Sequence, residues 1–496
     1  RFSISDDGKT LAYVGTGDRR GVYVAHLQSG KAEFIADEPG AEYWPQFSPD
    51  GTQLLFTAGD FDVAAGSNLN RIYVADIDKK TSRPVTPEDM HCRDASWAPD
   101  GKSLAFVGVK TTVVDEYLNP KSPSKETAWT TNWSHYGYDS GRSSFNPNES
   151  AIGVSNVSSL AVSWSNRHFS TIRSYVAVVG NEAYYGDYRG TFRAVNATTG
   201  KLNWSKQLSG KHQGHVIADD VIYVTSVSRL YALNRKNGKE LWAWDSPGGS
   251  LSAPTVAGEQ LYVQVGSPLV LHAFNAQDGV PLWTASGGRM AVSGQHIYTT
   301  NHNKLETLAT RDGKRIWSVD LAEDNYTAPV ISGDSLYLNS ASGKLTAFDI
   351  SDRESAPQSP SWFASIEPQS QGDGPATPAV DKQRVYIGSG DKFYSFDRAP
   401  KEPTEQKPLW VTRVQSPFFV TSPTIANGIV YSAAGNSDLY AFEASTGKLL
   451  WTHTVPGASN PIRSKPVVAN GRLYHAATFA FKVLAFVPTH PVDPEE

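Results

Sequence analysis

Short runs in which apolar and polar residues alternate, separated by turn residues, recur along most of the chain. Three of them are APTVAGEQLYV from Ala253, TPAVDKQRVYI from Thr377 and SPTIANGIVYS from Ser422. Each run predicts a strand, a tight turn at Gly, Asp or Asn, and a second strand, because a period of two places every second side chain on one face of a sheet. The pattern therefore predicts an all-β protein.

A second motif follows these strand pairs at regular distances. It places a Gly at its seventh position and a Trp at its eleventh, as in AVNATTGKLNW from Ala194 and ALNRKNGKELW from Ala232. Successive tryptophans lie about 41 residues apart, which is the length of a unit of four short strands. The tryptophans are Trp164, Trp204, Trp242, Trp283, Trp317, Trp362, Trp410 and Trp451. The glycines of the five copies of equal length are Gly200, Gly238, Gly279, Gly313 and Gly447.

The residue types of this motif have a structural explanation. A Gly takes a positive φ without steric cost, so it suits the turn between the outer strands of a unit. The Trp then begins the outermost strand, where its indole can fill the space between neighbouring units. We therefore expect the tryptophans at equivalent positions between units, and we assign them a structural role.

Together the two motifs resemble the PQQ-type β-propeller repeat over about residues 127–487. This family contains quinoprotein dehydrogenases and proteins without enzymatic activity, such as the BamB outer-membrane assembly lipoprotein. The resemblance implies a ring of four-stranded blades, and the spacing of the tryptophans predicts eight of them. The segment SSLAVSW, which ends at Trp164, would then pair with the last blade and close the ring.

A different repeat occupies the beginning of the chain. It reads FSISDDGKTLAYV from Phe2, FSPDGTQLLFT from Phe47 and WAPDGKSLAFV from Trp97. In a Pro-Asp-Gly turn, Pro sets φ, Asp accepts hydrogen bonds from the backbone and Gly takes the left-handed conformation. The repeat resembles that of TolB-type propellers, which have WD40-like blades, and it is present as two copies and the beginning of a third. A closed ring needs more copies, so we predict a partial propeller.

These repeats define the expected domains. Residues 1–114 form the partial TolB-like propeller, and residues 129–487 form the eight-bladed PQQ-like ring. Between them residues 115–128, DEYLNPKSPSKETA, are polar and rich in Pro and Ser, as in a linker. The stretch that follows the linker resembles the lead-in of secreted bacterial PQQ-like propellers. Residues 488–496 are expected to be a frayed tail.

Composition and charge exclude several classes of function. A net charge of −5 gives no electrostatic basis for binding nucleic acid, and no apolar run is long enough for a transmembrane helix. The single cysteine, Cys92, excludes an intramolecular disulfide and a Cys-rich metal site, and we interpret it as a buried, unreactive thiol. The chain begins at Arg1 without a Met, which we interpret as the product of processing.

Catalytic motifs are sparse in this sequence. It contains no GxSxG nucleophile elbow and no HExxH motif, which argues against a serine hydrolase and a zinc protease. His212 and His215 are the best metal-like pair, but no third ligand follows from their spacing, so we interpret them as surface histidines. We therefore assign no catalytic and no metal-binding residue, and we leave cofactor-binding residues unassigned.

The resemblance also implies an alternative function, that of a PQQ-dependent alcohol or sugar dehydrogenase. In that family PQQ and calcium lie on the propeller axis beside a catalytic Asp, and alcohol-oxidising members often carry a vicinal disulfide. No Cys follows Cys92, and the spacing of the tryptophans leaves no long insertion to build a cofactor pocket. No cofactor is therefore predicted, and PQQ and calcium belong to the alternative.

The favoured prediction is a β-propeller scaffold without enzymatic activity, which recognises proteins or ligands through its loops. BamB-like and TolB-like relatives both act as protein-interaction modules in the bacterial envelope. The resemblance therefore implies a protein partner in a cell-envelope or extracellular assembly. It also implies a location in the periplasm, at the cell surface or outside the cell.

Overall fold

Almost all regular secondary structure in this protein is β-strand. The computed structural model describes residues 2–15, 21–38, 41–59, 70–87, 90–110, 131–168, 170–172, 175–323, 326–368, 375–400, 405–415, 421–434, 438–455, 464–478 and 480–490. Within these ranges the one helical element is the short 3-10 helix η1, Val157–Ser159, and no helix is long and apolar enough to cross a membrane. The predicted all-β class is confirmed. The expected linker, residues 115–128, lies outside the described residues.

The chain divides into two compact units, residues 1–126 and 127–496. In the described part of the first unit, two four-stranded antiparallel sheets precede a two-stranded sheet. Their strands are β1 (Phe2–Ile4), β2 (Thr10–Gly15), β3 (Gly21–His26) and β4 (Ala32–Ala36); β5 (Ala41–Phe47), β6 (Gln53–Gly59), β7 (Arg71–Asp76) and β8 (Thr81–Pro84); and β9 (Met90–Trp97) and β10 (Leu104–Lys110).

The Pro-Asp-Gly turns of the first unit have the conformation that the sequence predicts. Before β6, Asp50 Oδ1 accepts hydrogen bonds from the backbone N–H of Thr52, at 3.1 Å, and from Ser48 Oγ, at 2.6 Å. The next residue, Gly51, has a φ of +72°. The turn therefore combines a side-chain acceptor with a left-handed glycine, and Cys92 lies buried in the strand β9 that follows.

In the described part of the second unit each sheet contains four consecutive strands, except the sheet that closes the ring, and the sheet of β37–β40 gains a fifth strand from earlier in the chain. The consecutive sets are β13 (Ala177–Val179), β14 (Glu182–Gly186), β15 (Thr191–Asn196), β16 (Leu202–Gln207); β17 (His212–Ala218), β18 (Val221–Ser226), β19 (Arg229–Asn234), β20 (Glu240–Asp245); β21 (Thr255–Ala257), β22 (Gln260–Val265), β23 (Val270–Asn275), β24 (Pro281–Ser286); β25 (Arg289–Ser293), β26 (His296–Asn301), β27 (Lys304–Ala309), β28 (Arg315–Asp320); β29 (Val330–Ser332), β30 (Ser335–Asn339), β31 (Lys344–Asp349), β32 (Trp362–Ser365); β33 (Ala379–Val380), β34 (Arg384–Ser389), β35 (Lys392–Asp397), β36 (Trp410–Arg413); and β37 (Thr424–Ala426), β38 (Ile429–Ala433), β39 (Asp438–Glu443), β40 (Leu449–Thr454).

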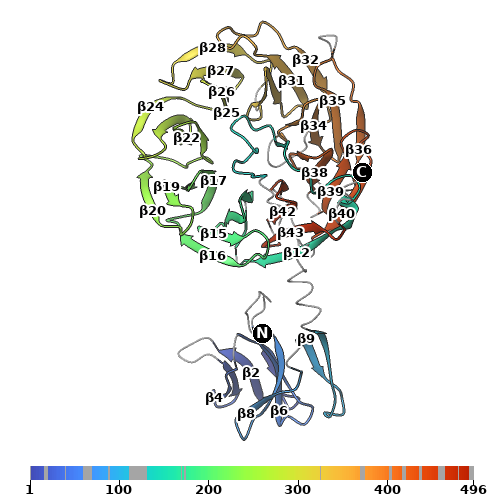
Figure 1. Ribbon diagram of the computed structural model, residues 1–496. Coiled ribbons are helices and arrows are strands. Elements are labelled where there is room, and N and C mark those ends of the chain that lie inside the picture. The colour runs from blue at the N-terminus through green and yellow to red at the C-terminus, as the bar shows by residue number, and fades with distance from the viewer. Residues whose placement is uncertain are drawn as a thin grey trace. The chain divides into compact units, whose positions relative to one another are not determined.

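These sheets stand side by side in a ring, with the first strand of each near the centre and the fourth at the rim (Figure 1). The closing sheet joins β41 (Val467–Ala469), β42 (Arg472–Ala477) and β43 (Lys482–Pro488) to β12 (Leu160–Arg167), which precedes β13 in the chain. Trp164 pairs with Ala485 in the antiparallel register of β12 and β43. The predicted pairing of the SSLAVSW segment with the last strands is confirmed. A two-residue strand, β11 (Phe145–Asn146), adds to the inner edge of β37.

The motif tryptophans all lie in the fourth, outermost strand of a sheet. Each donates its indole N–H to a backbone carbonyl of the following sheet, over 2.9 to 3.3 Å. The pairs are Trp164–Ala197, Trp204–Arg235, Trp242–Ala276, Trp283–Thr310, Trp317–Arg353, Trp362–Arg398, Trp410–Ala444 and Trp451–Leu160. The tryptophans therefore occupy equivalent positions between sheets.

The motif glycines lie under these indole rings. A Cβ added to Gly238 would be 2.5 Å from the ring of Trp204, and one added to Gly279 would be 2.6 Å from Trp242. Both glycines also have a positive φ, of +67° and +74°. Gly200, Gly313 and Gly447 repeat this arrangement beneath Trp164, Trp283 and Trp410. Each glycine thus meets two requirements at once, a left-handed turn and flat contact with an aromatic ring.

The core of the ring is a set of tyrosines on the second strands. Tyr184, Tyr262, Tyr298, Tyr337 and Tyr386 are almost completely buried. Each ring centroid lies 6.0 to 6.3 Å from that of the motif Trp on the fourth strand of its own sheet. Tyrosine and tryptophan together fill the space between adjacent sheets, which gives the ring its regular packing.

Candidate functional site

The centre of the ring is crossed by a segment of the chain itself. We call residues 131–150 the lead-in segment; it is drawn in teal at the centre of Figure 1. Trp133 forms an isolated antiparallel bridge with Val178 of β13, and the carbonyl of Ser134 accepts a hydrogen bond from Ile217 N of β17, at 3.1 Å. The lead-in segment therefore pairs with strands that lie far from it in the sequence.

The inner strands of the other sheets also form hydrogen bonds with the lead-in segment. His135 Nε2 lies 3.1 Å from the carbonyl oxygen of Val256 in β21, and Asn146 Nδ2 donates to Val468 O of β41 at 2.8 Å. Between these two ends, backbone N–H groups of four inner strands donate to lead-in carbonyls over 2.7 to 2.9 Å. The pairs are Val292–Ser140, Ile331–Gly141, Val380–Ser143 and Ile425–Ser144. The innermost strand of every sheet in this ring thus bonds to the lead-in segment.

The lead-in segment folds into tight turns to make these bonds. Tyr138, Arg142 and Ser144 all have a positive φ, of 78°, 66° and 56°, which is unfavourable for residues with a side chain. Asp139 stabilises the turn, because its two oxygens accept hydrogen bonds from the backbone N–H and the hydroxyl of Ser143, at 3.0 and 2.6 Å. The surrounding strands hold a conformation that an isolated peptide would avoid.

Two cationic side chains meet beside the lead-in segment. Lys465 is 3% exposed, and its Nζ donates to Ser144 Oγ at 2.8 Å. The same Nζ lies 4.7 Å from the ring centroid of Tyr136, and Arg142 Cζ lies 5.2 Å from that ring. Burial, and then the nearby Arg142 charge, lower the pKa of Lys465 to about 7.

Sequence reasoning missed Lys465, although the repeat contains a signal for it. Lys465 lies three residues before Val468, which is the contact position of its inner strand. The residues three positions before the contact residue of the other inner strands are Tyr175, Gly214, Ala253, Arg289, Ala328, Thr377 and Ser422. Lys465 and Arg289 are the two cations in this set, so comparing the repeats column by column would have singled them out.

The structure corrects the interpretation of the two histidines. His212 and His215 are buried, not on the surface, and Nε2 of the first lies 3.2 Å from Nδ1 of the second. A β-bulge between His212 and Gly214 brings both rings to the same side of β17. Burial lowers the pKa of His212 to about 3, so the pair is neutral at pH 7. Among the described residues, no group of three or more His, Cys, Asp or Glu side chains could hold a metal ion.

A crevice of about 410 Å³ lies beside the lead-in segment. It opens between the turn joining β25 to β26 and the turn after β29, and it is lined mainly by polar groups, among them Asp139, Ser140 and Arg353. Arg353 is held in place by bonds to Ser293 Oγ and to the carbonyl of Gly333, at 3.3 and 3.1 Å. Arg353 thus links the two turns on either side of the crevice.

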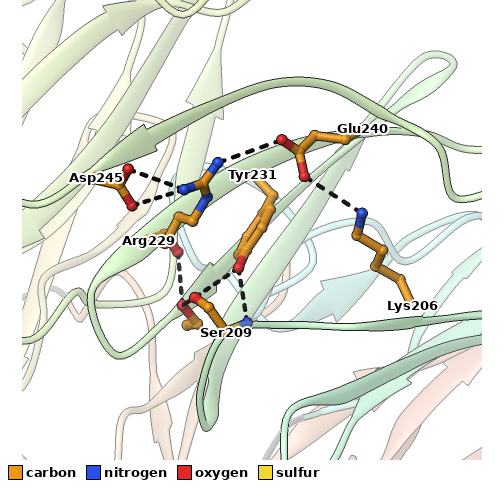
Figure 2. A network of polar contacts seen from close by, with 7 residues as sticks. Lys206, Ser209, Arg229, Tyr231, Glu240 and Asp245 are labelled. Carbon is orange, nitrogen blue, oxygen red and sulfur yellow. Dashed lines mark hydrogen bonds and ion pairs between the residues drawn. The ribbon is translucent and has the colours of Figure 1, made fainter.

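A polar network joins two neighbouring sheets at the rim (Figure 2). Arg229 bonds both oxygens of Asp245, at 3.0 and 3.1 Å, and lies 3.5 Å from Glu240, which in turn contacts Lys206 of the preceding sheet at 3.4 Å. Tyr231 OH donates to Ser209 Oγ at 2.8 Å. These charges face solvent, so each pair contributes at most about 1 kcal/mol. The network connects two neighbouring sheets through surface ion pairs, and we assign it a structural role.

The comparisons with known proteins agree with this architecture. Residues 122–226, 189–289, 270–399 and 359–489 match the family model described as outer membrane protein assembly factor BamB. Residues 2–167 match the model described as TolB beta propeller domain. The chain is similar to BamB of Yersinia pestis, with 24% identity over 383 residues, which cover 67% of this chain and 92% of that protein.

Two further likenesses are to proteins named as enzymes. Tetrathionate hydrolase of Acidithiobacillus ferrooxidans is 26% identical over 327 residues, which cover 57% of this chain and 58% of that protein, so the match spans little more than half of the hydrolase. The crystal structure of quinohemoprotein alcohol dehydrogenase from Comamonas testosteroni matches with a TM-score of 0.60 at 15% identity, covering 72% of this chain and 80% of that one. That likeness shows the fold alone. From its repeats, its ring of sheets and the family match over most of its length, this chain belongs to the PQQ-like β-propeller family of the outer membrane protein assembly factor BamB.

Proposed function

We propose that this protein is a non-catalytic β-propeller scaffold that acts outside the cytoplasm and recognises a protein partner. In this proposal residues 129–487 form an eight-bladed ring, and residues 1–114 form a partial TolB-like propeller ahead of it. The partner belongs to a cell-envelope or extracellular assembly. The name of the Yersinia pestis relative, an outer membrane protein assembly factor, supports a role of this kind.

The observation that carries the proposal is the lead-in segment at the centre of the ring. Its backbone bonds to the inner strands through Ser134, Ser140, Gly141, Ser143 and Ser144. A backbone bonded in this way occupies part of the centre of the ring. The surfaces that remain open to a partner are the two loop faces and the rim, where propellers bind other proteins.

The dehydrogenase alternative is favoured by the likeness in fold to quinohemoprotein alcohol dehydrogenase. Calcium takes six to eight oxygen ligands, mainly carboxylates. In the described part of the chain no group of three or more acidic, His or Cys side chains could hold such an ion. Two cations, Lys465 and Arg142, meet at the ring of Tyr136 and would repel a divalent cation. The acids of the lead-in segment, Asp139 and Glu149, already accept hydrogen bonds within the chain. These residues do not fit a calcium–PQQ pair, and no oxidation step is assigned to them.

Site-specific photo-crosslinking tests the scaffold function. Asn237, in the turn between β19 and β20, and Asn303, in the turn between β26 and β27, are both exposed and lie on opposite faces of the ring, because consecutive turns alternate between the two ends of the strands. A photoreactive residue is placed at each position, and the protein is irradiated in its native envelope fraction. The expected result is one discrete adduct from one face, which excess unlabelled protein suppresses.

Two outcomes would contradict the proposal. Adducts that are absent at both positions, or that form equally at both and resist competition, indicate no specific partner on either face. In parallel, the purified chain is titrated with PQQ and calcium, followed by tryptophan fluorescence and by dye-coupled oxidation of alcohols and sugars. Saturable quenching together with substrate-dependent dye reduction would establish the dehydrogenase instead.

A further inference from the structure

The cations beside the lead-in segment lack the counter-charges that buried cations normally have. Among the described residues, Lys465 and Arg142 form no ion pair with a carboxylate. Lys465 Nζ has three N–H groups and a single hydrogen bond, to the neutral Ser144 Oγ. The guanidinium of Arg142 has five N–H groups and one bond, from Nη1 to the carbonyl of Met290 at 2.9 Å. Most of the donor capacity of both groups is therefore unused.

Asp139 does not supply the missing counter-charge. The charge of Asp139 raises the pKa of Lys465 slightly against the larger effect of burial. Both oxygens of Asp139, however, accept hydrogen bonds from Ser143. A desolvated cation is costly unless a charge or several hydrogen bonds compensate for it. A single buried Lys could be tolerated in its neutral form, but the same site also holds Arg142, which stays charged at every relevant pH. The arrangement thus carries a local excess of positive charge.

A third cation adds to this excess. Arg289 stands at the same repeat position as Lys465, is exposed, and donates from Nη1 to Tyr326 O at 2.7 Å. The charge of Arg289 contributes to lowering the pKa of Arg142. Thr377 and Ser422, at the same position in two other sheets, bond to one another through their hydroxyls at 2.9 Å. No sheet contributes an acidic residue at this position.

We propose that Lys465 and Arg142, with Arg289 at the entrance, form a binding site for a small oxyanion on the axis of the ring. Two positive groups on one aromatic ring, Tyr136, fix their mutual position. Arg142 is part-exposed and supplies the planar donor pair that matches two oxygens of one anion. The buried indole N–H of Trp133, whose ring lies 5.7 Å from Lys465 Nζ, has no partner among the described residues and is a further donor nearby.

The expected ligand is a sulfate, phosphate, sulfonate or carboxylate group small enough to lie beside the lead-in segment. The site does not depend on the proposed scaffold function, because it is assayed on the purified chain without any partner. A failure of photo-crosslinking therefore leaves the anion site standing, and an absence of anion binding leaves the scaffold proposal standing.

Calorimetric titration with sodium sulfate, and separately with sodium phosphate, tests the site at pH 6.5 and at an ionic strength fixed with sodium chloride. The expected result is saturable binding of one anion. Because each cation contributes a charge-assisted bond, Lys465→Met and Arg142→Met should each weaken binding by about tenfold or more. Lys236→Met, at an exposed turn of the same ring, is the matched control and should leave binding unchanged.

The pH provides an independent readout on the unmodified chain. Sulfate keeps its charge over this interval, so its binding should weaken between pH 6.5 and pH 9, because Lys465 loses its proton and the anion loses one positive partner. The site is disproved by sulfate and phosphate that both fail to saturate, or by folded Lys465→Met protein that binds as tightly as the original. Where Lys465→Met does not fold, the part-exposed Arg142→Met variant decides the matter by the same criterion.

Discussion

At the scale of single residues, the glycine under each indole has two separable functions. Gly279 has a φ of +74°, and a Cβ there would be 2.6 Å from the ring of Trp242. Gly258 has a φ of +59°, and a Cβ there would meet no atom within 4 Å. The two positions share the backbone requirement and differ in the ring contact. The chain therefore contains its own control for separating the two contributions.

We expect Gly279→Ala to destabilise the protein more than Gly258→Ala. The second substitution carries the cost of a left-handed alanine, about 1–2 kcal/mol. The first adds displacement of a packed Trp, so its loss in the free energy of unfolding should be larger by about 1–3 kcal/mol. Urea denaturation of both variants measures the difference. Equal losses would mean that the indole moves aside without cost.

Lys465 gives the protein a predictable dependence of stability on pH. Its pKa is lowered from 10.5 to about 7 in the folded chain, so between these values the unfolded chain binds more protons than the folded one. The contribution of this group to the free energy of unfolding therefore rises as the pH increases from 7 towards 10. Below pH 7 the contribution is flat. Urea midpoints at pH 6.5 and pH 9, compared with those of Lys465→Met, should show a smaller rise in the variant, and an identical rise would disprove the assignment.

At the scale of elements, strands in the ring differ sharply in how much they tolerate change. β43 lies between β12 and β42 and bonds to both, whereas β40 is the outermost strand of its sheet. The repeat already contains a proline in such an outer strand: Pro281 begins β24 at the position that Leu449 occupies in β40. Proline is compatible with an edge and incompatible with the interior of a sheet.

Ala485→Pro in β43 should therefore be far more damaging than Leu449→Pro in β40. Ala485 pairs with Trp164 on one side and with Tyr474 on the other, so a proline removes a ladder bond at the closure of the ring and costs about 3 kcal/mol or more. Leu449→Pro reproduces a natural feature of the repeat and should cost about 1 kcal/mol or less. Thermal denaturation followed by circular dichroism compares them. A similar loss in both variants would contradict the closure of the ring through β43.

At the scale of the whole molecule, the ring is held together by the same bond repeated at each junction between sheets. An indole on one sheet, such as Trp204, reaches a carbonyl on the next, such as that of Arg235. The last junction, between Trp451 and Leu160, has the same form although 291 residues separate the two. Every junction between sheets in the described residues thus carries the same indole-to-carbonyl bond. In the proposed scaffold function, a protein partner therefore binds at the faces or the rim of the ring.

The repeats explain why the ring could be predicted and the axis could not. Alternation and the Trp-Gly spacing report on packing inside and between sheets, and both recur in every unit. The axis is formed by residues that differ between units, such as Lys465 and Arg289, and by a lead-in segment without a repeat. The surface assignment of His212 and His215 was wrong because a β-bulge, which no periodicity reveals, turns both towards the interior. What is shared between repeats is legible in a single sequence. A residue that is unique to one repeat, such as Lys465, can be noticed in the sequence, but its place beside the lead-in segment follows only from the structure.

The bond between the beginning and the end of the ring has a consequence for how the protein is made. Thr131 and Asn470 exchange hydrogen bonds across 339 residues of chain. β12 meets its partner β43 across a similar interval. β43 is synthesised after β12 and after every strand between them, so β12 has an open edge until β43 emerges. High separation between paired residues slows folding. During that time the nascent chain is exposed to misassembly with other copies of itself, and we expect it to depend on factors that shield strand edges until β43 has formed.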